Sequence, residues 1–136
     1  MKHQILQLSA IVLAFLLMGC KDDTPYADVS TTEVEMHIQN PLADATIISG
    51  QDLTHLDGRI DANAKMGGWG VDLINEETGE IVESFEEYYE HTQFIVHHHW
   101  FFEYTDTMHF EIQVRAITVQ MDTLATKSIH ITCLPE

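Results

Sequence analysis

The sequence predicts an all-β protein with an immunoglobulin-like β-sandwich fold of about seven antiparallel strands. Three observations support this prediction. Apolar and polar residues alternate with a period of two over most of the chain after Glu33, as in strands that bury one face. Turn-forming residues separate the alternating runs, and no run holds a clear helical stripe. A single sheet would leave too many apolar rows exposed, so we expect two packed sheets and little or no helix.

The first strands are short and follow one another closely. Residues 34–38 alternate until Asn40-Pro41, and residues 46–49 form a second run that ends at Gly50. A third run covers residues 55–62. We expect a polar loop over residues 63–68, before a fourth strand over 69–74 that begins with a tryptophan.

The remaining strands hold the largest apolar side chains. Residues 75–79 predict a turn in which Gly79 supplies a positive φ, residues 80–85 predict a returning strand, and the acidic residues 86–90 predict a loop. Three further strands follow. Their expected inward rows are Phe94, Val96, His98, Trp100 and Phe102, then Met108, Phe110, Ile112, Val114 and Ala116, and finally Ile129, Ile131 and Cys133.

The N-terminus has the pattern of a lipoprotein signal peptide. An apolar run over residues 5–18 follows Lys2 and ends in Leu17-Met18-Gly19-Cys20, and it is short for a bilayer core of about 30 Å. We therefore expect residues 1–19 to be a lipoprotein signal peptide and Cys20 to be the lipidation site; the alternative is an uncleaved short anchor helix. Residues 20–32 predict a lipidated flexible tether, and residues 33–136 predict the immunoglobulin-like domain.

Two resemblances extend this prediction. The lipid-acceptor cysteine followed by Lys21-Asp22-Asp23 resembles the surface-export signal of Bacteroidetes lipoproteins. That resemblance implies an outer-membrane protein held by palmitate on Cys20 and facing the cell exterior; a merely solvating tether is the alternative. Residues 41–44, Gly50, 56–62 and 110–116 resemble the immunoglobulin-like domains of Bacteroidetes surface lipoproteins, and are most similar to a histidine-rich lipoprotein family of unknown function. This resemblance implies a lipoprotein, and no enzyme activity.

Composition excludes several classes of function. The formal net charge is −16, which repels the phosphates of nucleic acids and favours cations or basic partners. With Cys20 lipidated, Cys133 has no intramolecular disulfide partner, and its place in an apolar row predicts a small buried residue. The chain contains no nucleophile elbow, phosphate-binding glycine loop or zinc-protease helix, so we expect no enzyme.

The histidines are the main candidate for a ligand site. His97 and His99 share the outer face of one predicted strand, roughly 6.5–7 Å apart. If this strand and the next form a hairpin, His109 and Glu111 come opposite or diagonal to them. These four residues would then form a metal site suited to zinc or copper.

Two other interpretations of the histidines stay open. If the two runs belong to opposite sheets, the histidines are ordinary outward polar residues, and a third possibility is pH sensing.

The predicted function is a lipid-anchored binding module on the outer membrane. The alternative is a structural or accessory subunit of an outer-membrane assembly, with an envelope protein as partner and no ligand of its own.

Overall fold

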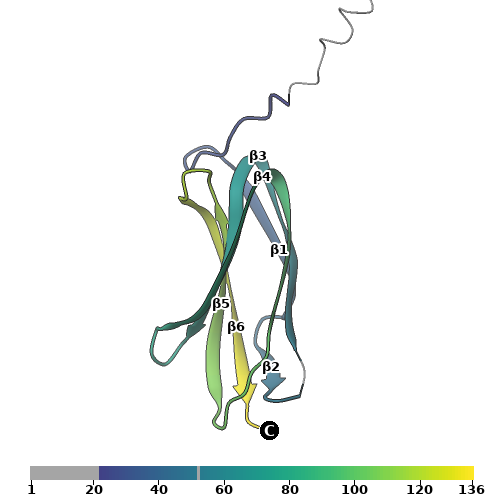
Figure 1. Cartoon of the computed structure of the whole chain (residues 1–136), viewed down its shortest axis with the longest axis vertical. Helices are drawn as coiled ribbons and strands as arrows, with labels where there is room; N and C mark the ends of the chain where they lie inside the picture. Colours follow the sequence, from purple (N-terminus) through teal and green to yellow (C-terminus); the bar gives the residue numbers. More distant parts are fainter. Residues whose placement is uncertain (1–21, 52) are drawn as a thin grey trace, which may run out of the picture.

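The protein is all-β in the part of the chain that the structure describes. The computed structural model describes residues 22–51 and 53–136, and these contain six strands and no helix (Figure 1). The strands are β1 Val34–Asn40, β2 Ala45–Ile48, β3 Thr54–Asn75, β4 Ile81–Trp100, β5 Met108–Ile117 and β6 Thr123–Leu134. They form one curled mixed sheet in the order β1-β3-β5-β6-β2, with β4 paired to β3. The all-β prediction is thus confirmed.

Strands β3 and β4 bend, so each takes part in two layers of the curled sheet. The first half-sheet consists of β1, residues 54–62 of β3 and residues 93–100 of β4. The second half-sheet consists of residues 81–88 of β4, residues 68–75 of β3, and strands β5, β6 and β2. In Figure 1 the two layers are joined at the top by the bends of β3 and β4.

The loops expected at residues 63–68 and 86–90 are wrong, because both segments lie inside the long strands β3 and β4. Register shifts between Asp61 and Met66 and between Met66 and Gly68 mark the bend of β3. Backbone packs closely here: a Cβ on Gly67 would lie 2.4 Å from the Thr118 carbonyl oxygen. Glycine and polar residues therefore bend the strand at this place without ending it.

The short strand β2 differs from the predicted all-antiparallel pattern. It pairs in parallel with β6, from Ala45 opposite Ile131 to Ile48 opposite Leu134. The turn before it contains Asp44 at a φ of 60°, and the Asp44 N–H donates to the His130 carbonyl 2.9 Å away. The chain thus leaves β1 in the first half-sheet and joins the outer edge of the second.

One apolar core lies between the two half-sheets. The expected inward rows of β4, β5 and β6 are buried, apart from half-buried His98 and Met108, and Cys133 is a fully buried free thiol. The largest fully buried side chains come from both layers: Trp69, Phe94, Phe110, Leu56, Ile60, Met66, Ile112 and Ile131. Burial of alternate residues on facing layers is the main source of stability for such a sheet.

The segment before β1 contacts the bend. The Ala27 N–H donates to the Lys65 carbonyl over 2.8 Å, and the Lys65 N–H donates to the Pro25 carbonyl over 2.7 Å. Pro25 and Ala27 fall in the range 20–32 that the sequence predicts as a tether. The predicted signal peptide, residues 1–19, and the lipidation site Cys20 lie outside the described residues. Within residues 22–51 and 53–136, no helix is long and apolar enough to cross a membrane.

Candidate functional site

The four predicted metal ligands fall into two separate pairs. His97 and His99 lie on the outer face of β4 in the first half-sheet, where β4 pairs with β3. His109 and Glu111 lie on β5 in the second half-sheet, opposite Thr132 and His130 of β6. The predicted hairpin of these two runs is wrong, because residues 101–107 carry the chain from one half-sheet to the other. The four-residue site is therefore not assembled.

Each member of the β5 pair has partners within the second half-sheet. The Nδ1 atom of His109 lies 3.2 Å from the Thr132 hydroxyl oxygen. Glu111 accepts hydrogen bonds from the Ser128 hydroxyl and, at 3.5 Å, from the Gln113 amide. These contacts are those of a polar sheet surface.

A different histidine completes the pair on β4. The register of β3 and β4 places His55 directly opposite His99 and Asp57 directly opposite His97. The ring centroids of His55 and His97 are 5.9 Å apart, those of His55 and His99 are 6.3 Å apart, and those of His97 and His99 are 6.4 Å apart. We call His55, His97, His99 and Asp57 the histidine cluster.

His55 was not among the predicted metal ligands. The alternation of its strand places it outward, but alternation says nothing about which strand is the neighbour. The available signal was the matching pattern of two runs with outward histidines, at residues 55–61 and 93–99. Only the pairing of β3 with β4 brings those histidines together.

Asp57 orients one of the three imidazoles. Its Oδ1 atom lies 2.7 Å from the Nδ1 atom of His97, and its Oδ2 atom accepts a hydrogen bond of 3.4 Å from the Asn40 amide. The hydrogen bond with His97 lowers the pKa of Asp57 below its ordinary value. A carboxylate that holds Nδ1 of a histidine fixes the ring and assigns metal binding to Nε2.

The three rings are spaced more widely than imidazoles that bind one zinc ion. Among the described residues, no group of three or more His, Cys, Asp or Glu side chains is positioned to hold a metal ion as it stands. Imidazoles that share one zinc ion at 2.0–2.1 Å have ring centres roughly 5 Å apart. All three histidines are exposed on the strand surface, and binding of one ion would require their rings to approach by about 1 Å.

Two open hollows border the histidine cluster. One, of about 590 Å³, is lined by His55 and Asp57 together with Pro41, Leu42 and Ile47. The other, of about 900 Å³, is lined by Asp57 and His97 together with His37 and Arg59. The cluster is therefore accessible from two sides.

His98 has a different environment from its two neighbours. Its side chain is 16% exposed and stacks on Phe85, with ring centroids 4.8 Å apart. Its Nε2 atom lies 3.1 Å from a carboxylate oxygen of Glu83. His98 thus links the two ends of β4, as expected for an inward histidine with a hydrogen-bond partner.

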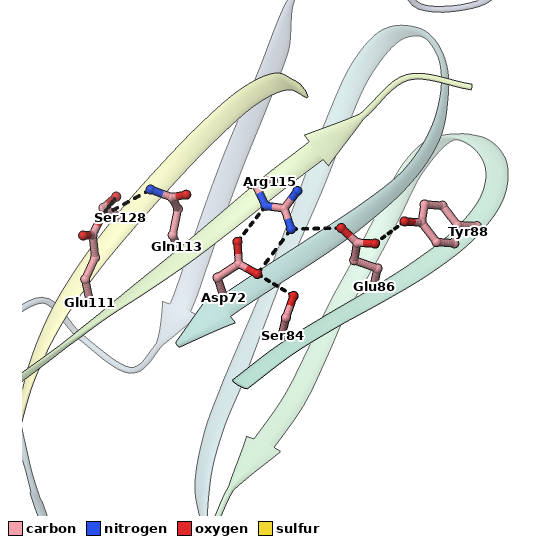
Figure 2. Close-up of polar contacts among 8 residues, drawn as sticks. All are labelled: Asp72, Ser84, Glu86, Tyr88, Glu111, Gln113, Arg115 and Ser128. Atoms are coloured by element: carbon pink, nitrogen blue, oxygen red, sulfur yellow. Dashed lines mark hydrogen bonds and ion pairs between the residues drawn. The ribbon is translucent and has the colours of Figure 1, made fainter. Parts of the chain in front are cut away.

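A second polar cluster lies on the outer face of the second half-sheet (Figure 2). Asp72 is buried and accepts a hydrogen bond of 2.6 Å from the Ser84 hydroxyl. Arg115 contacts it with Nη2, which donates over 3.3 Å, and with Nε, which forms an ion pair at 3.1 Å without hydrogen-bond geometry. The same Nη2 atom also donates to Glu86 over 2.9 Å.

The charged groups of this polar cluster pair with one another. Hydrogen bonds from Tyr88 and then from Arg115 lower the pKa of Glu86. Gly70 lies beneath the ion pair, where a Cβ would be 3.1 Å from Glu86 and 3.2 Å from Arg115. Every charged group in the cluster has a partner of opposite charge, which indicates a role in stability.

No protein-family model matches the chain, and no curated protein is similar to it in sequence. The functional assignment therefore depends on local geometry. Of the two polar clusters, only the histidine cluster combines exposed donor atoms, an orienting carboxylate and adjacent open space. Three imidazoles beside open space are donor groups of the kind that zinc and copper prefer.

Proposed function

We propose that the protein is a non-enzymatic, lipid-anchored binding module of the outer membrane that faces the cell exterior and binds zinc or copper through His55, His97 and His99. The observation that carries this proposal is the triangle of three imidazoles at 5.9–6.4 Å, one of them held by Asp57. Such a donor set has an outer-shell carboxylate of the kind that accompanies histidine ligands in metal sites.

The position of the cluster supports its presentation away from the membrane. The N-terminal segment meets the domain at Lys65, in the bend of β3 (Figure 1). The histidine cluster lies at the other end of the same strand segment, with His55 ten residues from Lys65, or roughly 30 Å at the rise of an extended strand. A lipid on Cys20 would therefore leave the cluster pointing away from the bilayer.

The proposal also covers the fold, which we assign to the immunoglobulin-like sandwiches, in keeping with the resemblance to Bacteroidetes surface lipoproteins. If β3 and β4 are each divided at their bends, one layer consists of β1, the first half of β3 and the second half of β4. The other layer consists of the first half of β4, the second half of β3, and strands β5, β6 and β2. The parallel pairing of a short early strand with the last strand, and the core between the layers, support this assignment.

Metal titration of the full chain in detergent tests the function. We expect one equivalent of Zn²⁺ or Cu²⁺ to bind at pH 7.5. His55→Ala, His97→Ala and His99→Ala should each lower the affinity about tenfold or more, whereas His109→Ala serves as the matched control and should have no effect. Absence of metal uptake by the unaltered protein, or equal loss with His109→Ala, would contradict the proposal.

A structural role in an outer-membrane assembly is the second candidate. It is favoured by the exposed apolar side chains along β4, which include Ile81, Val82 and Phe85. Affinity purification from detergent-solubilised envelope, followed by mass spectrometry, tests it. A stable stoichiometric partner whose recovery is unchanged by His97→Ala would favour this role over metal binding.

A further inference from the structure

Strand β4 has one unpaired edge along its whole length. Its 20 residues pair only with β3, in the first half-sheet as in the second. The other edge strands are shorter, since β1 has 7 residues and β2 has 4. No strand among residues 22–51 and 53–136 covers the free edge of β4, so its outward N–H and C=O groups are available to another chain.

The first half of β4 is exposed on both of its faces. Every residue from Ile81 to His91 is exposed, although the neighbouring segment of β3 is largely buried. Five large side chains in this segment are each 36–59% exposed: Ile81, Val82, Phe85, Tyr88 and Tyr89. An unpaired strand that carries this much exposed apolar and aromatic surface is suited to strand addition, in which main-chain hydrogen bonds give affinity and side chains give specificity.

The negative charge of residues 81–90 favours a basic partner strand. The chain has no Lys or Arg between Lys65 and Arg115, and residues 81–90 contain Glu83, Glu86, Glu87 and Glu90. Each carboxylate has a partner: His98 for Glu83, Arg115 and Tyr88 for Glu86, Trp69 for Glu87, and Tyr26 for Glu90. Only Glu86 contacts a permanent cation, so the edge keeps a strong negative potential.

A second copy of the chain is a poor occupant. If two β4 strands paired about a twofold axis at Phe85, Glu83 of each copy would lie opposite Glu87 of the other. Like charges directly opposite on paired strands are destabilising, and each copy carries a formal net charge of −16. A basic strand would instead place cations beside these carboxylates.

We propose that residues 81–90 of β4 bind an extended, lysine- or arginine-rich segment of a partner protein by strand addition. This proposal is independent of the metal site, because the histidine cluster lies on the other half of β4. The glutamates also have a simpler use, which is to keep the edge from pairing with any strand. Peptide binding distinguishes the two uses.

The probe is a nine-residue peptide that alternates lysine and valine, added to the full-length, ¹⁵N-labelled chain in neutral detergent. Its control keeps every lysine but replaces two central valines with prolines, which removes strand-forming N–H groups at equal charge. We expect the strand-forming peptide to bind about tenfold more tightly than the proline peptide and to protect the amides of residues 81–90 from hydrogen exchange.

A double substitution tests the charge contribution. Glu83→Gln with Glu87→Gln should weaken binding of the lysine–valine peptide about fivefold or more, whereas Glu103→Gln with Asp106→Asn removes the same charge from a loop and should change it less than twofold. Equal affinity for the two basic peptides, or protection outside residues 81–90, would overturn the proposal. That comparison uses the unaltered protein, so it remains decisive if a variant fails to fold.

Discussion

The Nδ1 atom of His97 lies 2.7 Å from the Oδ1 atom of Asp57, on the neighbouring strand. The two residues are 40 positions apart in the sequence and are direct partners in the register of β3 and β4. This contact holds the ring of one of the three histidines that the proposed metal site would use.

Asp57→Asn should weaken metal binding without removing it. The amide keeps the size of the side chain but loses the charge that orients His97, and loss of such outer-shell partners lowers metal affinity about 10- to 100-fold. Zinc or copper titration at pH 7.5 measures the effect. The control is Asp61→Asn, whose carboxylate accepts hydrogen bonds from Arg59 and Gln93 on the same face. An equal loss in both variants would point to general surface charge.

Glu76→Gln should reduce stability more in mild acid than in mild base. His130 hydrogen-bonds to Glu76, and this contact raises the pKa of His130 above its ordinary value. A raised folded-state pKa stabilises the protein below the unfolded-state pKa of about 6.5, and the contribution disappears as the pH rises through the folded-state pKa. Urea unfolding at pH 5.5 and pH 8.5 measures the difference between variant and unaltered protein. NMR titration of His130 should show a lower pKa in the variant, and a difference that is larger at pH 8.5 would contradict the assignment.

Arg115→Met should destabilise the fold strongly. The Asp72 side chain is only 9% exposed, and the substitution removes its cationic partner. Leaving a buried charge without its partner costs about 3–5 kcal/mol. The matched control is Arg59→Met, which breaks an ion pair with Asp61 whose arginine is half exposed and should cost less than about 1 kcal/mol. Urea unfolding of both variants gives the comparison, and similar losses would show that the Asp72–Arg115 pair is not effectively buried.

Gly67→Ala should disturb the bend of β3. The added Cβ would lie 2.4 Å from the Thr118 carbonyl oxygen, so backbone must move. We expect a loss of about 2 kcal/mol or more in the free energy of unfolding. Gly79→Ala is the control, because that turn glycine has a φ of 72° but nothing within 4 Å of the added atom, and it should cost about 1 kcal/mol. Thermal and urea unfolding measure both, and the reverse order would mean that the bend is not tightly packed.

Cys20→Ala should release the protein from the membrane. If Cys20 is the lipidation site, the unaltered protein incorporates labelled palmitate and sediments with the outer membrane, whereas the variant does neither. Added protease should cleave the unaltered protein on intact cells if it faces the exterior. Palmitate incorporation by the variant, or a mature chain that still contains residues 1–19, would contradict the predicted processing.

The local sequence pattern is sufficient to predict the class of fold and most of the core. Side chains on a strand alternate between two faces, so local alternation is enough to place Phe110, Ile112 and Val114 inside and their neighbours outside. The turn-forming residues 75–79 likewise predict a turn with a positive φ at Gly79, and the observed φ is 72°. These features depend only on residues near one another in the chain.

Which strands are neighbours depends on contacts between segments that are distant in the sequence. Alternation is the same whether a strand continues through a bend or ends in a loop, and so the continuity of β3 and β4 was not predictable from residues 63–68 and 86–90. The composition of the candidate site follows from that pairing. It separates His97 and His99 from His109 and places them beside His55, because strand register is set by packing between distant segments and not by the local pattern.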